Sequence, residues 1–155
     1  MINDSFNIVI DSDNKYEGTT NDGKKYTFDF SFMGQDIWEM RFSFRTKIGT
    51  TVAPAEDSAI IAIPEFNFVN NFRVGGDKHI CAKSSKVIGI TKYDVINSKS
   101  YCHAGYNDNP CVLVSQPSSQ IFTVNIDNVE GQANTSALDY VMILNFKKCS
   151  CDKYK

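Results

Sequence analysis

Hydrophobic and polar residues alternate along several segments of the chain, most regularly in its last long segment, residues 120–147. Within it, Phe122, Val124 and Ile126 point to one side, and Thr123, Asn125 and Asp127 point to the other. A period of two residues is typical of a half-buried β-strand. This segment therefore predicts a strand that turns one face to the interior.

The segment that follows, DYVMILNF at 139–146, is apolar on both faces. A strand of this kind belongs inside a sheet, where it is covered on both sides or covered by a neighbouring subunit. The residues between the two strands, 129–138, contain Gly, Asn, Thr and Ser, so the chain must turn there. The end of the chain thus predicts two strands joined by a polar loop.

Two further alternating segments, YTFDFSF at 26–32 and WEMRFSFR at 38–45, lie on either side of a break at 33–37 that contains Gly34. Taken alone, this arrangement predicts a tight hairpin within one sheet. Alternatively, the break carries the chain across the edge of a sandwich. Eight large side chains on the apolar faces are expected to form much of the core: Tyr26, Phe28, Phe30, Phe32, Trp38, Met40, Phe42 and Phe44.

Shorter strands and polar connections account for most of the remaining chain, and no segment sustains the spacing of an amphipathic helix over three turns. About eight short strands separated by turn residues predict an all-β antiparallel β-sandwich. We expect a single domain over 1–155 with a short polar tail at 149–155. The additional strands are expected at 6–10, 58–63, 86–93 and 111–115, and residues 67–69 are expected to be extended and polar. Gly89 is expected to mark a bulge or a close backbone approach. The longest connections are expected at 11–25, 48–57 and 97–110.

Composition and charge narrow the possible functions. The net charge is −2 and no basic stripe is visible, which argues against a nucleic-acid partner. No apolar run approaches about 18 residues, so no membrane span is expected. The first residues lack the features of a secretory signal, and the five cysteines are an odd number. We therefore expect synthesis in the cytoplasm and cysteines that are mostly reduced.

Soft metal ligands occur in two pairs, His79 with Cys81 and Cys102 with His103, and Cys111 follows them. Zinc accepts such ligands. The spacing matches no compact zinc pattern, however, and the residues fall on different loops and strands. Small buried cysteines and loop histidines are the preferred interpretation, so no metal is assigned.

Two other motifs carry a weaker suggestion of metal binding. Cys149 and Cys151 form a C-x-C pair on the tail, which we interpret as incidental. Residues 11–14 (DSDN) begin like an EF-hand loop, but Tyr16 stands where glycine is required and no helices flank it. A solvated turn is the preferred interpretation.

No constellation in the sequence predicts catalysis. A thiol of Cys102 or Cys111 with His103 as its base is the best nucleophilic arrangement available, and nothing else supports it. The glutamates that a glycosidase would need are scattered along the chain and are interpreted as surface charges: Glu39, Glu56, Glu65 and Glu130. We therefore predict no enzyme, no catalytic residue and no cofactor.

A carbohydrate-binding or protein-binding β-sandwich module is the alternative function. Trp38 is the only tryptophan and could provide a sugar-stacking platform, with Tyr101 and Tyr106 in a nearby loop. Trp38 begins an alternating aromatic strand, however, so a position in the core is the preferred prediction for it.

From Trp38 to Lys147 the order of features resembles a known family. WEMRFSFRTKIG is followed by a short apolar strand that ends at Pro64, then by SSKVIGI and SYCHAGYNDNPCVLVSQPSSQ, and finally by IFTVNI and DYVMILNF. The chain is similar here to the small single-jelly-roll minor capsid and penton proteins of large double-stranded DNA viruses and their virophages. The likeness is clearest at 108–126 and 139–146 and covers about two thirds of the chain.

The resemblance implies a jelly roll, in which two four-stranded antiparallel sheets lie face to face, and a structural role in an icosahedral shell. The family has no catalytic residues to carry over. The expected partners are other capsid proteins and further copies of this chain, with a pentamer favoured, and the expected location is the virion. A minor capsid or cement position elsewhere in the shell is the other expectation within the family.

Overall fold

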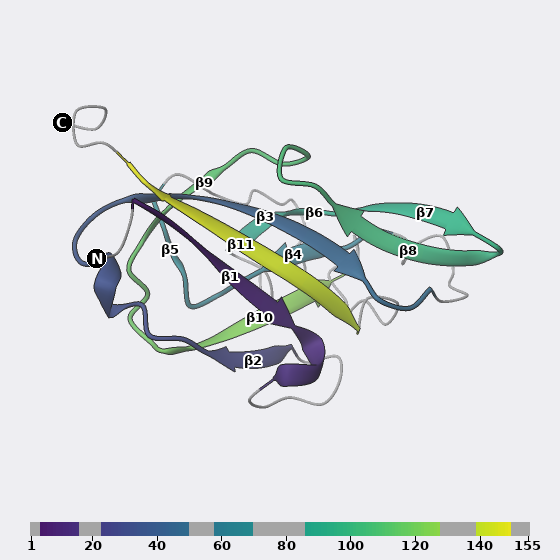
Figure 1. Cartoon of the computed structure of the whole chain (residues 1–155), viewed down its shortest axis with the longest axis horizontal. Helices are drawn as coiled ribbons and strands as arrows, with labels where there is room; N and C mark the ends of the chain where they lie inside the picture. The colour runs from purple at the N-terminus through teal and green to yellow at the C-terminus, as the bar shows by residue number, and fades with distance from the viewer. Residues whose placement is uncertain (1–3, 16–22, 50–57, 70–85, 128–138, 150–155) are drawn as a thin grey trace, which may run out of the picture.

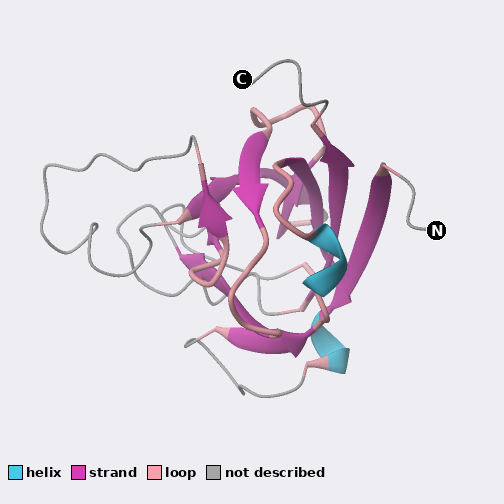
Figure 2. Cartoon of the chain, turned by 90° about the vertical axis from the view of Figure 1, so that its left-hand side faces the viewer, coloured by secondary structure: helices cyan, strands magenta, loops and turns pink. Residues whose placement is uncertain are grey.

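The structure, a computed structural model, is a sandwich of antiparallel sheets (Figures 1 and 2). It describes residues 4–15, 23–49, 58–69, 86–127 and 139–149. The connections expected within 50–57, 70–85 and 128–138, and the tail beyond Cys149, lie outside these ranges. Within the described residues there is no α-helix, and the chain forms two short 3-10 turns, η1 (Ser12–Asn14) and η2 (Ser31–Met33).

One sheet has the strand order β1-β11-β3-β8-β7, and β9 and β5 extend it beside the remaining part of β3. The second sheet has the order β2-β10-β4-β6. The strands of the first sheet are β1 (Ser5–Asp11), β11 (Tyr140–Lys148), β3 (Trp38–Thr46), β8 (Lys99–Ala104), β7 (Lys92–Ile96), β9 (Val112–Ser115) and β5 (Asn67–Phe68). Those of the second are β2 (Lys24–Thr27), β10 (Ile121–Asp127), β4 (Ile60–Ala62) and β6 (Val87–Ile90).

Strand β11 lies between β1 and β3, which confirms that this apolar strand is internal to a sheet. Ile143 pairs with Val9 on one side and with Ser43 on the other. The inward side chains of β11 are buried, while Val141 and Ile143 face outward and are only half-buried. The inward set is Tyr140, Met142, Leu144 and Phe146.

Aromatic side chains from both sheets meet in the core. Phe122 of β10 lies 5.6 Å from Phe66 between ring centroids, and Phe66 lies 6.2 Å from Phe146 of β11. Six of the eight side chains expected in the core are buried, and Phe28 and Phe32 are partly buried against it. The alternating pattern therefore identified the core correctly.

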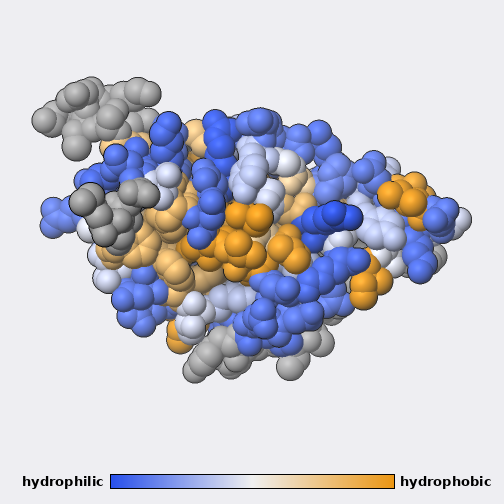
Figure 3. All heavy atoms as spheres, in the orientation of Figure 1, coloured by the Kyte–Doolittle hydropathy of each residue, from blue (hydrophilic) through white to orange (hydrophobic). Residues whose placement is uncertain are grey.

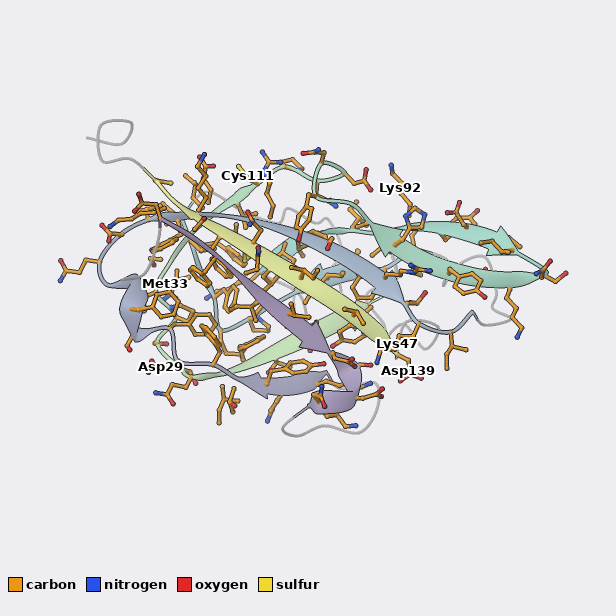
Figure 4. All side chains as sticks on the ribbon, in the orientation of Figure 1. Asp29, Met33, Lys47, Lys92, Cys111 and Asp139 are labelled. Carbon is orange, nitrogen blue, oxygen red and sulfur yellow. The ribbon has the colours of Figure 1, made fainter. Side chains whose placement is uncertain are left out.

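The predicted hairpin over 26–45 is wrong, because its two strands belong to different sheets. The strand expected to reach residue 32 ends at Thr27. Asp29 accepts a hydrogen bond from the backbone N–H of Ser31 at 3.0 Å, which starts the turn η2. The chain then crosses the sandwich edge, and the Trp38 indole N–H donates to the Met33 carbonyl at 3.3 Å. Asp29 and Met33 mark this crossing in Figure 4.

The strand expected at 86–93 divides at Thr91 into β6 and β7, which lie in different sheets. The Thr91 N–H donates to the Ala59 carbonyl, and the Ala59 N–H donates to the Thr91 hydroxyl. This clamp holds the point where the chain changes sheets. Gly89 pairs with Ile61 of β4, and the register shifts between Gly89 and Val87, so the irregularity lies beside Gly89. A Cβ added at Gly89 would lie 2.5 Å from the Phe42 ring, which confirms the close approach.

The loop expected at 97–110 is also wrong at its start, because residues 99–104 form β8 and pair with β7. Asn97 and Ser98 have φ angles of 52° and 63° and connect the two strands. Positive φ at both central residues defines a type I′ turn, whose twist matches that of a hairpin. With β5, β7 and β8 included, the described chain has eleven strands rather than about eight.

A buried pair of tyrosines joins the sheets at one end of the sandwich. The hydroxyl of Tyr26 on β2 lies 2.8 Å from that of Tyr140 on β11. Burial raises the pKa of Tyr26 to about 12, and burial likewise raises the pKa of Tyr140. Each hydroxyl therefore satisfies the other in an interior that disfavours phenolate.

Replacing Phe122 by Ala should destabilise the fold by about 3–5 kcal/mol, because it leaves a cavity where the aromatic side chains of the two sheets meet. Chemical denaturation measures the loss. Ile121→Ala, at the next and more exposed position of β10, is the matched control and should cost well under about 1 kcal/mol. Equal losses for the two variants would contradict this assignment of the core.

Stability should fall as pH rises from 10 to about 12, because the unfolded chain releases a proton that folded Tyr26 retains. Tyr26→Phe should reduce this pH dependence and cost about 1–3 kcal/mol at neutral pH, since it leaves the Tyr140 hydroxyl without its partner. Denaturation across this pH range measures both effects. A Tyr26→Phe profile that matches the unaltered chain would contradict the buried pair.

Candidate interaction surface

The cysteine and histidine residues that suggested a metal site do not gather in the described part of the chain. Cys102 and His103 are neighbours on β8, so they face opposite sides of the sheet. Cys102 is buried, whereas His103 points outward with its Nε2 atom 2.7 Å from the Asp94 carboxylate. No three candidate ligands lie together within the described ranges, and His79 and Cys81 fall outside them.

The same geometry separates the candidate thiol from its candidate base. The Cys102 side chain lies in the core, and its backbone is bound by Thr46, whose hydroxyl accepts from Cys102 N–H at 3.1 Å. Cys111 lies just before β9 and is half-buried. No arrangement of Cys102 with His103 as its base therefore exists on this face.

The EF-hand-like segment forms a capped turn that a lysine neutralises. Asp11 accepts from the Asp13 backbone N–H at 2.9 Å, and Lys47 contacts the carboxylates of both aspartates. The hydrogen bond from Lys47, followed by that from the Asp13 backbone, lowers the pKa of Asp11. Figure 4 places Lys47 beside Asp139, at the start of β11. The turn anchors this end of the sheet, because the buried Ser12 hydroxyl accepts from the Tyr140 backbone N–H at 3.0 Å.

The two glutamates within the described ranges, Glu39 and Glu65, lie in different segments. Glu65 accepts hydrogen bonds from the Thr123 backbone N–H at 2.8 Å and from the Thr123 hydroxyl at 2.7 Å, so its carboxylate ties a loop to β10. Glu39 lies on the outer side of β3. Glu56 and Glu130 fall outside the described residues. Glu65 thus has a structural contact in place of the catalytic partner that a glycosidase requires.

Trp38 is in the core, as preferred from its place in the sequence. The side chain is 2% exposed and makes edge-to-face contacts with Phe6 and Phe32. Tyr101 is half-buried on β8, and Tyr106 is exposed in the loop that follows. A sugar-stacking platform at Trp38 is therefore excluded by its burial.

The outer face of β1, β11 and β3 carries an apolar patch, defined here as Val9, Val141 and Ile143. Val9 is 67% exposed, and Ile143 pairs directly opposite it. Figure 3 shows hydrophobic surface at the centre of this face, which continues into moderately hydrophobic surface on the left and borders hydrophilic surface above and to the right. Such a patch on the outside of a sheet marks a place where another molecule can pack.

Polar groups frame this outer patch. The Asn145 side chain donates to the Asn7 side chain at 2.8 Å across β11 and β1. On the opposite side, Arg41 and Arg45 project outward from β3, at positions that pair with Asn145 and Val141. An apolar centre with a polar rim is the usual arrangement of a protein interface.

The hairpin of β7 and β8 forms a second exposed region and extends beyond the ends of the other strands (Figure 1). All five residues of β7 are exposed, including Tyr93, Val95 and Ile96. Along the hairpin, a surface pocket of about 460 Å³ is lined by Arg45, Asp94, Ile96, Tyr101, Cys102 and His103. The apolar patch and the hairpin belong to the same sheet. The sequence indicated a cover over the strand at 139–146, but it did not identify the hairpin.

Comparison with known proteins adds no relative. A scan against family models finds no match, and a search of curated proteins finds none either. Among the described residues, no helix has the length and apolar character needed to cross a membrane. The functional argument therefore rests on the fold, on the outer surface and on the family resemblance seen in the sequence.

The fluorescence of Trp38 should be blue-shifted relative to free tryptophan and poorly quenched by iodide, because the indole is buried and its N–H is bonded to Met33. Unfolding in denaturant should abolish both properties. The spectrum should not respond to added glycans. A glycan-dependent spectrum with ready quenching would contradict the burial of Trp38.

Proposed function

We propose that this chain is a single jelly roll and that it serves as a structural protein of an icosahedral virus shell. The strand order carries the proposal. When β5, β7 and β9 are set aside as additions to the first sheet, eight strands remain. Numbered one to eight along the chain (β1, β2, β3, β4, β6, β8, β10 and β11), they have the orders 1-8-3-6 and 2-7-4-5. Two interlocked Greek keys require this order. The crossing at 28–37, which separates β2 from β3, agrees with it.

The outer patch supports a role in assembly. The inward side chains of β11 pack in the core, whereas on the outward side Val9 is 67% exposed and Val141 and Ile143 are half-buried. A shell protein buries such surface against its neighbours. The patch has an apolar centre, a pair of amide side chains at its rim and two arginines beside it. This combination suits a protein partner better than a small ligand.

The position in the shell follows from the family resemblance. We favour a penton, in which five copies close a ring at a vertex, over a minor capsid or cement position between larger proteins. The partners are then further copies of this chain and other capsid proteins, and nucleic acid is not among them. Synthesis takes place in the host cytoplasm, and the protein resides in the virion.

A carbohydrate-binding or protein-binding module is the alternative. The burial of Trp38 removes the feature that favoured sugar binding. The exposed Tyr106 and the half-buried Tyr101 lie on different elements and form no aromatic platform with it. The outer patch fits a shell contact at least as well as it fits a separate binding partner, so the structural role is retained as the proposal.

Purified virus particles provide the test. Quantitative mass spectrometry should find this chain in particles at a fixed ratio to the major shell protein, and washing in moderate salt should not remove it. Val9→Asp should reduce incorporation at least about tenfold, because it places a charge in the contact.

The control for this experiment is Ile48→Asp, which introduces the same charge at a position of similar exposure away from the patch. It should be incorporated like the unaltered chain. Absence of the chain from washed particles would contradict the proposed function. Equal incorporation of the Val9 and Ile48 variants would contradict the role of the outer patch.

A further inference from the structure

The β7–β8 hairpin separates from the sandwich at a defined point. The pairing of β3 with β8 ends at Arg45 and His103. At the next position the Thr46 hydroxyl takes the place of a backbone partner, accepting from Cys102 N–H at 3.1 Å and donating to Cys102 C=O at 3.3 Å. From there to the turn, β8 pairs with β7 alone among the described strands, so β7 forms the free edge of the sheet.

The register shows which backbone groups β7 presents at this edge. Ile96 and Lys99 flank the two-residue turn and so form a hydrogen-bonded pair, and such pairs alternate along an antiparallel hairpin. Lys92 and Asp94 therefore bond to β8, while the N–H and C=O groups of Tyr93 and Val95 point outward. Unpaired edge groups of this kind are a template for another strand.

The side chains of β7 protect the edge only in part, through the charged residues Lys92 and Asp94. Tyr93 and Val95 share one face and are 46% and 61% exposed. Ile96 is 56% exposed on the other face. The strand contains no proline and no bulge, which are common ways of blocking an edge. A regular, exposed edge strand whose outward backbone groups belong to Tyr93 and Val95 is suited to pairing with a strand from another molecule.

We propose that β7 pairs in antiparallel fashion with β7 of a second copy of this chain, across a two-fold axis at Asp94. This register uses all the outward backbone groups of Tyr93 and Val95 on both copies. It also places Tyr93 of each copy opposite Val95 of the other, and an aromatic residue opposite a β-branched one is a favourable cross-strand pair. The sheet then continues from one copy into the next.

The sequence of β7 is complementary to itself in this register, which favours a second copy as the occupant. Besides the Tyr93–Val95 pairs on one face, each Asp94 on the other face lies diagonal to Lys92 of the second copy. Lys92 also contacts Asp108 of its own chain at 3.2 Å. Each Asp94 carboxylate, which faces its symmetry mate across the axis, lies 2.7 Å from its own His103 Nε2. Figure 4 shows Lys92 at the end of the hairpin that joins the sandwich.

The β7–β7 contact rests on the proposed function only in that a virus shell would be the place where it forms. A two-fold contact through the hairpin is isologous and joins chains in pairs, whereas the ring of a penton needs a separate head-to-tail contact. The hairpin would therefore link one ring to another, or pair two chains in a minor position. The two contacts use different surfaces and can be tested separately.

The first test compares Val95→Pro with Val95→Thr by sedimentation equilibrium. Proline removes an N–H that points outward and not toward β8, so the hairpin itself keeps its hydrogen bonds. Threonine preserves the N–H and the branched shape. Val95→Pro should raise the dissociation constant of the pair at least about tenfold, and Val95→Thr should change it little. A Val95→Pro chain with an unchanged circular dichroism spectrum and unchanged association would overturn the proposal.

The second test is oxidative cross-linking with oxidised glutathione. Asp94 lies on the proposed axis, where facing Cβ atoms are about 4.5–5.5 Å apart, so Asp94→Cys should form a disulfide-linked dimer. Lys92→Cys would lie about 13 Å from its symmetry mate and should remain at the background of the native cysteines. Peptide mapping by mass spectrometry identifies the link between the two copies of position 94.

Equal cross-linking of the two cysteine variants, or no link at position 94, would overturn the proposed register and axis. A chain that stays monomeric but binds another capsid protein through β7 would overturn the choice of a second copy as the occupant. Dimers that depend on β7 in a chain absent from particles would support this inference and contradict the proposed function, so the two failures are distinguishable.

Discussion

The burial of aromatic and aliphatic side chains between the sheets is the constraint on which the rest of the structure depends. Strand β11 is central to it, because its inward residues are fully buried while it pairs on both sides with long strands. Phe66 connects this face to Phe122 in the opposite sheet. Because the inward side chains of β11 pack in the core, only its outward residues, among them Val141 and Ile143, can contact other molecules.

Polar contacts determine where each strand leaves the sandwich. Asp29 starts the turn that carries the chain across the edge, and Thr91 holds the change of sheet between β6 and β7. The Thr46 hydroxyl ends the pairing of β3 with β8. These short side chains bond to backbone groups that would otherwise continue a ladder. Their positions, more than the apolar pattern, produce the projecting hairpin and its open edge.

Strands with strict alternation could be predicted from the sequence, and 38–45 and 139–146 both lie where the pattern placed them. The hairpin at 92–104 could not, because its turn is Asn97-Ser98 and lacks the glycine that usually signals a type I′ turn. Its strand β7 is exposed on both faces and so has no alternation to detect. The split at Thr91 depends on a contact with Ala59, which is distant in sequence.

The candidate surface was only partly predictable, because it too depends on strand limits and pairing that the alternating pattern does not show. An apolar strand at 139–146 indicated a cover on both sides, and the outward residues are the uncovered ones. The opposition of Cys102 and His103 follows from strand geometry, but only once 99–104 is known to be a strand. The edge of β7 requires the register as well, because the register decides that Tyr93 and Val95 point outward.

Self-assembly of the chain is the central claim of this account, and its native mass across a concentration series tests it most directly. Native mass spectrometry of the unaltered protein should show defined oligomers that grow with concentration, with pairs and closed rings among them. A protein that remains monomeric over the whole range would contradict assembly of the chain with itself.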